Sequence, residues 1–198
     1  MILPPGTYRY ELRSAGGLIA FEEERVTSVA MSGTRRSVDG ANRHEVEATL
    51  SADGVVQRVS VRYQRGPFNR TAVYDVDGDT LRGRVSAVAG RNEVAVALGR
   101  YREIDAGLTF FKALIVAHIR ARGAERWTGR VAVIDPNTLV AASLKQTCAR
   151  RDDAGRLWVY ELRMGETETI EIDAQGRIPR RVDDRGVETV LVGFDPAT

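Results

Sequence analysis

The chain has 198 residues, enough for one sizeable hydrophobic core and too few to require two domains. Hydrophobic residues make up 43% of the sequence and charged residues 28%, a balance typical of a globular protein rather than of a disordered one. The net charge is only +2, and 27 acidic residues are interspersed among 29 basic ones. We therefore expect one domain over residues 1–198 and no nucleic-acid partner.

Cysteine content and hydropathy leave the compartment open. Cys148 is the sole cysteine, so no internal disulfide can form. No stretch approaches the roughly 18 apolar residues of a membrane span, and we expect no transmembrane segment. The start of the chain lacks a basic region followed by an apolar run. The compartment therefore stays unknown: cytoplasmic as the chain stands, or periplasmic if a signal peptide has been removed. The oligomeric state is unknown as well.

Residues 105–122 form the one long helical pattern in the sequence, and both of its ends are marked. Asp105 is a plausible N-cap, and Gly123 follows the last turn, where a left-handed glycine suits a helix C-terminus. On a helical wheel the polar positions fall on one narrow stripe: Thr109, Lys112 and Arg120. Because the rest of the circumference is apolar, we expect a central helix with a sheet curled around it.

Residues 6–103 and 127–194 read as strands separated by short turns. Tyr8 and Tyr10 alternate with charged residues, as expected for a strand with one buried face. Residues 32–42 read as a polar loop. Counting the alternating segments gives about thirteen strands, and their short connections predict antiparallel neighbours. The predicted fold is thus mainly β: a long antiparallel meander that forms a half-open barrel around one helix.

The segment 169–182, TIEIDAQGRIPRRV, together with the order of elements, resembles the bacterial lipoprotein carriers LolA and LolB and related putative glycolipid-binding proteins. In that superfamily a curved antiparallel sheet wraps a helix and leaves an apolar cavity for acyl chains. The resemblance implies lipid binding in a similar cavity. Those carriers are exported, whereas this sequence shows neither a signal sequence nor a lipid-attachment cysteine near its start. No site residue can be transferred from the family.

Catalytic motifs are missing from the sequence. His44 and His118 are the only imidazoles, and both fall on apolar faces, where a hydrogen-bonded core histidine is the ordinary interpretation and ligand contact the alternative. No metal-ligand spacing, G-x-S-x-G or phosphate-binding loop occurs. We therefore predict no catalytic residue, no metal and no cofactor, and whether the protein is an enzyme stays uncertain, leaning no.

Aromatic residues give the strongest functional indication. Several occupy faces expected to look toward the helix, where they could line an apolar cavity or simply pack as a core. The predicted function is non-covalent binding or carriage of an apolar or amphipathic small molecule, such as a lipid or glycolipid. The alternatives are a structural or protein-interaction module with a filled core, and a lipocalin-like enzyme that uses a buried histidine. The predicted ligand-binding residues are Tyr8, Tyr10, His44, Phe111, His118, Trp158 and Tyr160.

Overall fold

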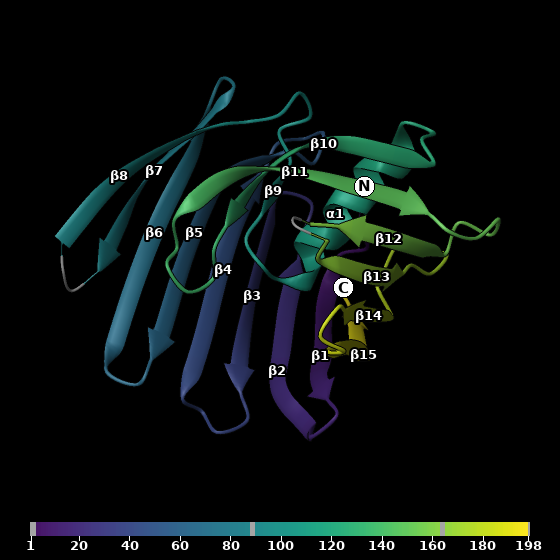
Figure 1. Ribbon diagram of the computed structural model, residues 1–198, viewed down its shortest axis with the longest axis horizontal. Helices are drawn as coiled ribbons and strands as arrows, with labels where there is room; N and C mark the ends of the chain where they lie inside the picture. The colour runs from purple at the N-terminus through teal and green to yellow at the C-terminus, as the bar shows by residue number, and fades with distance from the viewer. Residues whose placement is uncertain (1–2, 88–89, 163–164, 198) are drawn as a thin grey trace.

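The computed structural model describes residues 3–87, 90–162 and 165–197, and it confirms a mainly β chain with one helix (Figure 1). Nine strands precede the helix α1 (Thr109–Ala121) and six follow it. The strands before it are β1 (Gly6–Ser14), β2 (Gly17–Val26), β3 (Ala30–Ser37), β4 (Asn42–Leu50), β5 (Val56–Arg65), β6 (Phe68–Asp77), β7 (Thr80–Ala87), β8 (Gly90–Ala97) and β9 (Ile104–Asp105). Those after it are β10 (Arg126–Ile134), β11 (Ala141–Arg150), β12 (Leu157–Glu161), β13 (Thr167–Glu171), β14 (Arg180–Asp183) and β15 (Glu188–Pro196).

All described strands belong to one sheet of fifteen, in the order β8-β7-β6-β5-β4-β3-β2-β1-β15-β14-β13-β12-β11-β10-β9. Pairing of β1 with β15 joins the first half of the chain to the second. Within the described part of the chain, β8 and β9 are the two edges, so the sheet is open. Every pairing is antiparallel except that of β9 with β10, which is parallel because α1 forms the crossover between them.

The expected count of about thirteen strands was too low, because β3 and β9 were missed. The first part of the predicted polar loop, residues 32–37, lies in β3, which is hydrogen-bonded to both β2 and β4. Polar residues in this segment favoured a loop, but Arg35 can lie in a strand because it forms an ion pair with Glu22 on β2. Strand β9 has only two residues, too few to show any alternation.

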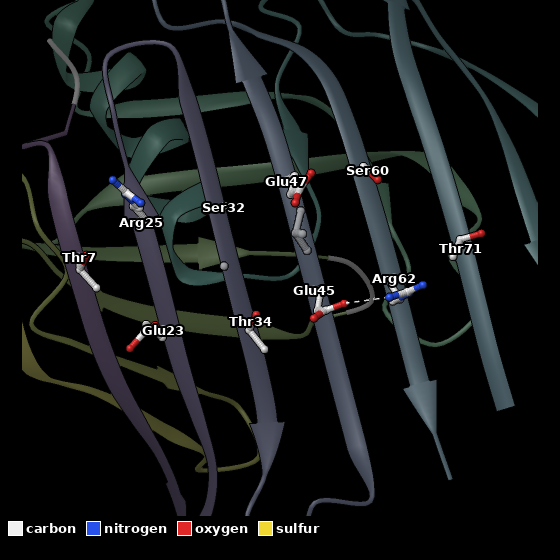
Figure 2. A pocket seen from close by; sticks show the side chains of 12 residues that line it. Thr7, Glu23, Arg25, Ser32, Thr34, Glu45, Glu47, Ser60, Arg62 and Thr71 are labelled. Carbon is white, nitrogen blue, oxygen red and sulfur yellow. Dashed lines mark ion pairs between the residues drawn. The ribbon is translucent and has the colours of Figure 1, made fainter. Parts of the chain in front are cut away.

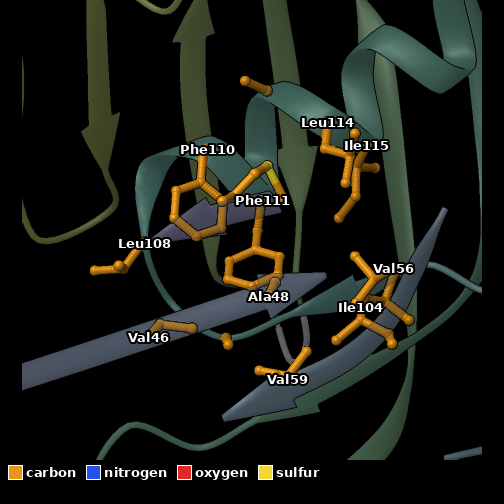
Figure 3. Packing of buried hydrophobic residues seen from close by; sticks show 14 of the residues in the cluster. Val46, Ala48, Val56, Val59, Ile104, Leu108, Phe110, Phe111, Leu114 and Ile115 are labelled. Carbon is orange, nitrogen blue, oxygen red and sulfur yellow. The ribbon is translucent and has the colours of Figure 1, made fainter. Parts of the chain in front are cut away.

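Alternation along β1 to β6 separates a polar face of the sheet from an apolar one, as period-2 side-chain geometry requires. Figure 2 shows the polar face, with Glu23 on β2, Glu45 on β4 and Arg62 on β5 among its side chains. The apolar face packs against the helix: Figure 3 shows Phe110 and Phe111 of α1 on the side that faces Val46 of β4. The core therefore lies between helix and sheet.

The helix begins later than predicted, at Thr109. Asp105 is not its N-cap, because Asp105 lies in β9, where its carboxylate accepts a hydrogen bond from the Gly107 amide at 2.8 Å. Leu108 occupies the N-cap position and provides no side-chain cap. At the other end, Gly123 has a φ of +66°, as predicted for a left-handed C-terminal glycine.

The polar stripe predicted on the helix is wrong in two of its three positions. Thr109 and Lys112 are buried, and only Arg120 is exposed. They are buried because the helix contacts both halves of the sheet, through Glu24 on β2 and through Glu168 on β13. Within the described residues, no helix is long and apolar enough to cross a membrane.

Candidate ligand-binding site

Two carboxylates from β2 cap the N-terminus of α1. Oε1 of Glu22 accepts a hydrogen bond from the Thr109 amide at 3.0 Å, and Oε1 of Glu24 accepts one from the Phe110 amide at 2.9 Å. Both side chains are fully buried. The first turn contains no acidic residue of its own, so the negative charges that favour a helix N-terminus come from a distant strand.

Arg35 on β3 balances this buried acidic pair. Its Nε donates to Oε2 of Glu22 at 2.7 Å, and its guanidinium also donates to the Gly107 carbonyl at 2.8 Å. Burial alone would raise the pKa of Glu22, but the charges of Arg35 and Arg181 outweigh it and lower the pKa to about 2. Burial and the Glu22 charge raise the pKa of Glu24 well above its ordinary value. Glu22 is therefore ionised near neutral pH, and the raised pKa of Glu24 favours its protonated form.

One turn into the helix, Lys112 joins α1 to strands β9 and β13. Its Nζ lies 2.7 Å from Oδ2 of Asp105 and 3.6 Å from Oε2 of Glu168, and it sits 4.2 Å from the centroid of the Tyr160 ring. Arg181 on β14 lies 3.9 Å from Oε1 of Glu168. Glu168 Oε2 is buried and has no hydrogen-bond partner among the residues that the structure describes. A ligand that donates a hydrogen bond could therefore bind this oxygen.

A cavity of about 420 Å³ opens beside this ionic cluster, lined by the start of α1 and by strands from both halves of the chain. This volume lies within the roughly 300–1,000 Å³ typical of small-molecule sites. The charged residues that line the cavity are Arg35, Asp105, Lys112, Asp135, Glu166, Glu168, Arg181, Asp183 and Arg185. Its apolar walls include Leu12, Leu144, Leu162 and Val187. The cavity is therefore amphipathic rather than uniformly apolar.

A second hollow, of about 620 Å³, lies on the polar face of β1 to β6 (Figure 2). Its walls are hydroxyls and charged side chains, among them Glu45 and Arg62, whose closest charged atoms are 3.9 Å apart. No side chain of this hollow has a buried polar atom without a partner among the described residues. The inner cavity thus offers the stronger ligand site.

The predicted ligand-binding residues all lie in the packed interior, and none of them lines the inner cavity in the described part of the chain. Tyr8 stacks at a tilt on Phe194 with ring centroids 4.7 Å apart, and Tyr10 lies on the same buried face of β1. Trp158 donates its indole N–H to the Gly155 carbonyl at 3.1 Å. Phe111 packs against Phe110 inside the helix–sheet core.

Tyr160 is the predicted residue nearest to the ionic cluster. Its ring contacts the Lys112 ammonium, and its hydroxyl donates to Oε1 of Gln146, a residue that itself lines the inner cavity. The ring is fully buried, and burial raises its pKa well above the ordinary value, so the phenol stays neutral. Tyr160 therefore contacts two residues that line the cavity, Gln146 and Lys112, without lining it itself.

The two histidines lie at opposite ends of the helix and do not meet. His44 lies beside Gly107, ahead of the first turn. His118 is in the last turn, where its Nδ1 lies 3.1 Å from Oε2 of Glu103, and Arg122 also donates to Glu103 at 3.4 Å. A histidine oriented by a carboxylate is one part of a general-base arrangement, but Nε2 of His118 is buried without a partner among the described residues.

His44 should make folding stability depend on pH. Burial, followed by the charge of Arg35, lowers its pKa from 6.5 to about 4 despite the opposing charges of Glu22 and Asp105. Between these pH values the unfolded state binds more protons, so stability is lost as pH falls from 6.5 toward 4. Between pH 6.5 and pH 4, the free energy of unfolding of His44→Leu should fall by about 3 kcal/mol less than that of wild type. Urea unfolding at the two pH values measures this difference. An unchanged pH slope in His44→Leu would contradict the assignment.

Sequence reasoning missed the charged residues that build the site: Glu22, Glu24, Arg35, Asp105 as an ion-pair partner, Lys112, Glu168 and Arg181. A signal for the first two was present, because Ala20, Glu22, Glu24 and Val26 share one face of β2, and both apolar members are buried. Partners for Lys112 and Arg181 lie on distant strands, and no local pattern reveals such pairs.

Comparisons with known proteins support the fold alone. No family model matches the chain, and no curated protein matches it. The chain is similar to the crystal structure of a DUF1089 family protein from Pseudomonas aeruginosa, with a TM-score of 0.60 and 18% identity. That likeness covers 81% of this chain and 88% of the other. The open antiparallel sheet with one buried helix is therefore an architecture that a solved protein shares.

Proposed function

We propose that the protein binds one amphipathic small molecule, lipid-like or glycolipid-like, in the inner cavity beside the start of α1. The observation that carries this proposal is Glu168 Oε2, a buried acceptor without a hydrogen-bond partner among the described residues, in a residue that lines the cavity. Its closest cation, Lys112 Nζ, lies 3.6 Å away, beyond hydrogen-bond distance, so a ligand donor would supply the hydrogen bond that this oxygen lacks. In this proposal, the sheet and the helix form a half-open barrel, and the ligand binds in the cavity at its open side.

The charges around the cavity indicate a head group without strong net charge. Lys112 is already paired with Asp105, and Arg181 lies close to Glu168. A further charge placed beside Lys112 and Glu168 would compete with these existing ion pairs, which is unfavourable at low dielectric. A neutral head that carries hydroxyl groups can donate to Glu168 Oε2 and accept from Arg181. The polar part of the ligand is thus recognised by hydrogen bonds rather than by ion pairing.

The apolar part of the cavity lining favours an apolar tail. Leu12, Leu144, Leu162 and Val187 line the same cavity, and each buried methylene of a ligand contributes about 0.8 kcal/mol. Tail length should therefore dominate affinity, while the head group sets orientation. This division agrees with what the resemblance to lipoprotein carriers implies, although the aromatic residues first expected to hold the tail pack elsewhere in the core.

Glu168→Gln should weaken binding of a monoacylglycerol by about fivefold or more, because charge-assisted hydrogen bonds are roughly twice as strong as neutral ones. The amide keeps the shape of the side chain, so the cavity should stay intact. Isothermal titration calorimetry measures the affinity. Glu171→Gln is the matched control, since Glu171 lies on the same strand but pairs with Arg180 at 3.0 Å outside the cavity. Equal affinities for both variants would refute the role of Glu168.

A filled structural module is the second candidate, and one observation favours it. The aromatic side chains expected to line a cavity are instead almost fully buried in the core, Phe111 and Tyr160 among them. If wild-type protein binds neither monoacylglycerols nor fatty acids of any chain length, this interpretation replaces ligand binding. The titration above therefore decides between the two.

A further inference from the structure

Three hairpins of the first half of the sheet lie side by side at one end of the molecule; we name residues 13–19, 36–43 and 64–70 the hairpin rim. Figure 1 shows the connections from β1 to β2, β3 to β4 and β5 to β6 ending together. Backbone hydrogen bonds join them: the Val38 amide donates to Ile19 at 3.0 Å, and the Gly66 amide donates to Ala41 at 3.0 Å. The rim is therefore one continuous surface.

Large apolar side chains are exposed along this rim. Phe68, which follows the turn between β5 and β6, is 65% exposed, and Val38 is 53% exposed. Leu18 and Ile19 are exposed by 37% and 40% on the first hairpin. These four are among the eight large hydrophobic side chains that are exposed in the described part of the chain. A gathering of this kind at loop tips indicates an interaction surface.

The same segments concentrate positive charge. They hold five arginines and one acidic residue, Asp39, a net charge of +4; Arg13 and Arg43 form ion pairs with Glu11 and Glu45 just outside the rim. The whole chain carries only +2, so the remaining residues sum to −2. Arginines interleaved with exposed apolar side chains match an anionic lipid surface, because the cations contact head groups while the apolar groups enter the interface. Nucleic acid would leave Phe68 and Val38 without an apolar partner.

We propose that the hairpin rim docks the protein on an anionic lipid bilayer. Arg70 on the rim donates to the Asn137 carbonyl at 2.5 Å, and Asn137 lines the inner cavity, so docking would place the cavity mouth near the membrane. This surface is separate from the cluster around Glu168. Bilayer binding and ligand binding can therefore fail independently.

Co-sedimentation with vesicles tests the proposal. We expect the protein to bind phosphatidylcholine vesicles that contain phosphatidylglycerol, to lose binding as salt rises, and not to bind pure phosphatidylcholine. Phe68→Ser and the double variant Arg36→Gln with Arg65→Gln should each lower the partition coefficient by about fivefold or more. All of these side chains are exposed, so the variants should keep the wild-type melting temperature.

Matched controls lie at the opposite end of the sheet. Val29 is 60% exposed in the turn between β2 and β3, and Arg82 is exposed on β7. Val29→Ser and Arg82→Gln should leave vesicle binding unchanged. The proposal is overturned if wild-type protein ignores anionic vesicles, or if the control variants reduce binding as much as the rim variants. It is also overturned if Phe68→Ser instead dissociates a dimer in sedimentation velocity while vesicle binding is absent.

Discussion

Replacing Phe111 with alanine should lower the free energy of unfolding by about 2–5 kcal/mol. The Phe111 ring is fully buried on the face of α1 that packs against β4, and its neighbour Phe110 lies 4.4 Å away between ring centroids. Truncation removes the buried ring and leaves a void that close-packed neighbours cannot fill. Urea unfolding monitored by circular dichroism measures the change.

Arg120→Ala is the matched control on the same helix. Its side chain is exposed in the last turn, so its loss should change stability by about 0.5 kcal/mol or less. Similar changes for Phe111→Ala and Arg120→Ala would show that the helix is not the centre of the core.

Replacing Arg35 with methionine should cost about 3 kcal/mol or more, because it leaves the Glu22 carboxylate buried without its partner. Glu22 also caps the helix at the Thr109 amide and shares its site with Glu24. In wild type, the lowered pKa of Glu22 contributes stability above pH 4.5, and this is lost as pH falls toward 2. Without Arg35 the variant should lose much of this pH-dependent stability. The difference in free energy of unfolding between wild type and Arg35→Met should therefore become smaller as pH falls toward 2.

Arg36→Met provides the control for charge and length. Arg36 is adjacent in β3 but exposed on the other face of the sheet, so its replacement should leave stability within about 0.5 kcal/mol. Adding Glu22→Gln to Arg35→Met should restore part of the loss, since it removes the unpaired charge. If Arg35→Met is as stable as Arg36→Met at neutral pH, the buried ion pair does not hold the helix to β2.

The parts of the fold that depend on local pattern could be predicted from the sequence. Alternation of Tyr8 and Tyr10 with charged residues correctly placed a strand with one buried face, and Gly123 correctly marked the end of the helix. Apolar residues around α1 correctly indicated a buried helix. Each of these rests on the physics of a single element, namely side-chain period or backbone conformation.

The site could not be predicted in the same way, because it consists of charges whose partners are distant in sequence. Lys112 was placed on an exposed stripe by the rule that charged residues face water, yet Asp105 and Glu168 neutralise it inside the protein. Glu22 was overlooked because an acidic residue in a strand is usually solvent-facing. Such exceptions become visible only when topology brings β2, α1 and β13 together.

Ligand binding beside Glu168 is the central claim, and a crystal structure of the protein with a bound monoacylglycerol tests it most directly. The account predicts electron density for a head-group hydroxyl within hydrogen-bond distance of Glu168 Oε2. It also predicts that the tail runs along Leu144 and Val187, which line the same cavity. Density on the polar face around Glu45 and Arg62, or an empty inner cavity at saturating ligand, would contradict it.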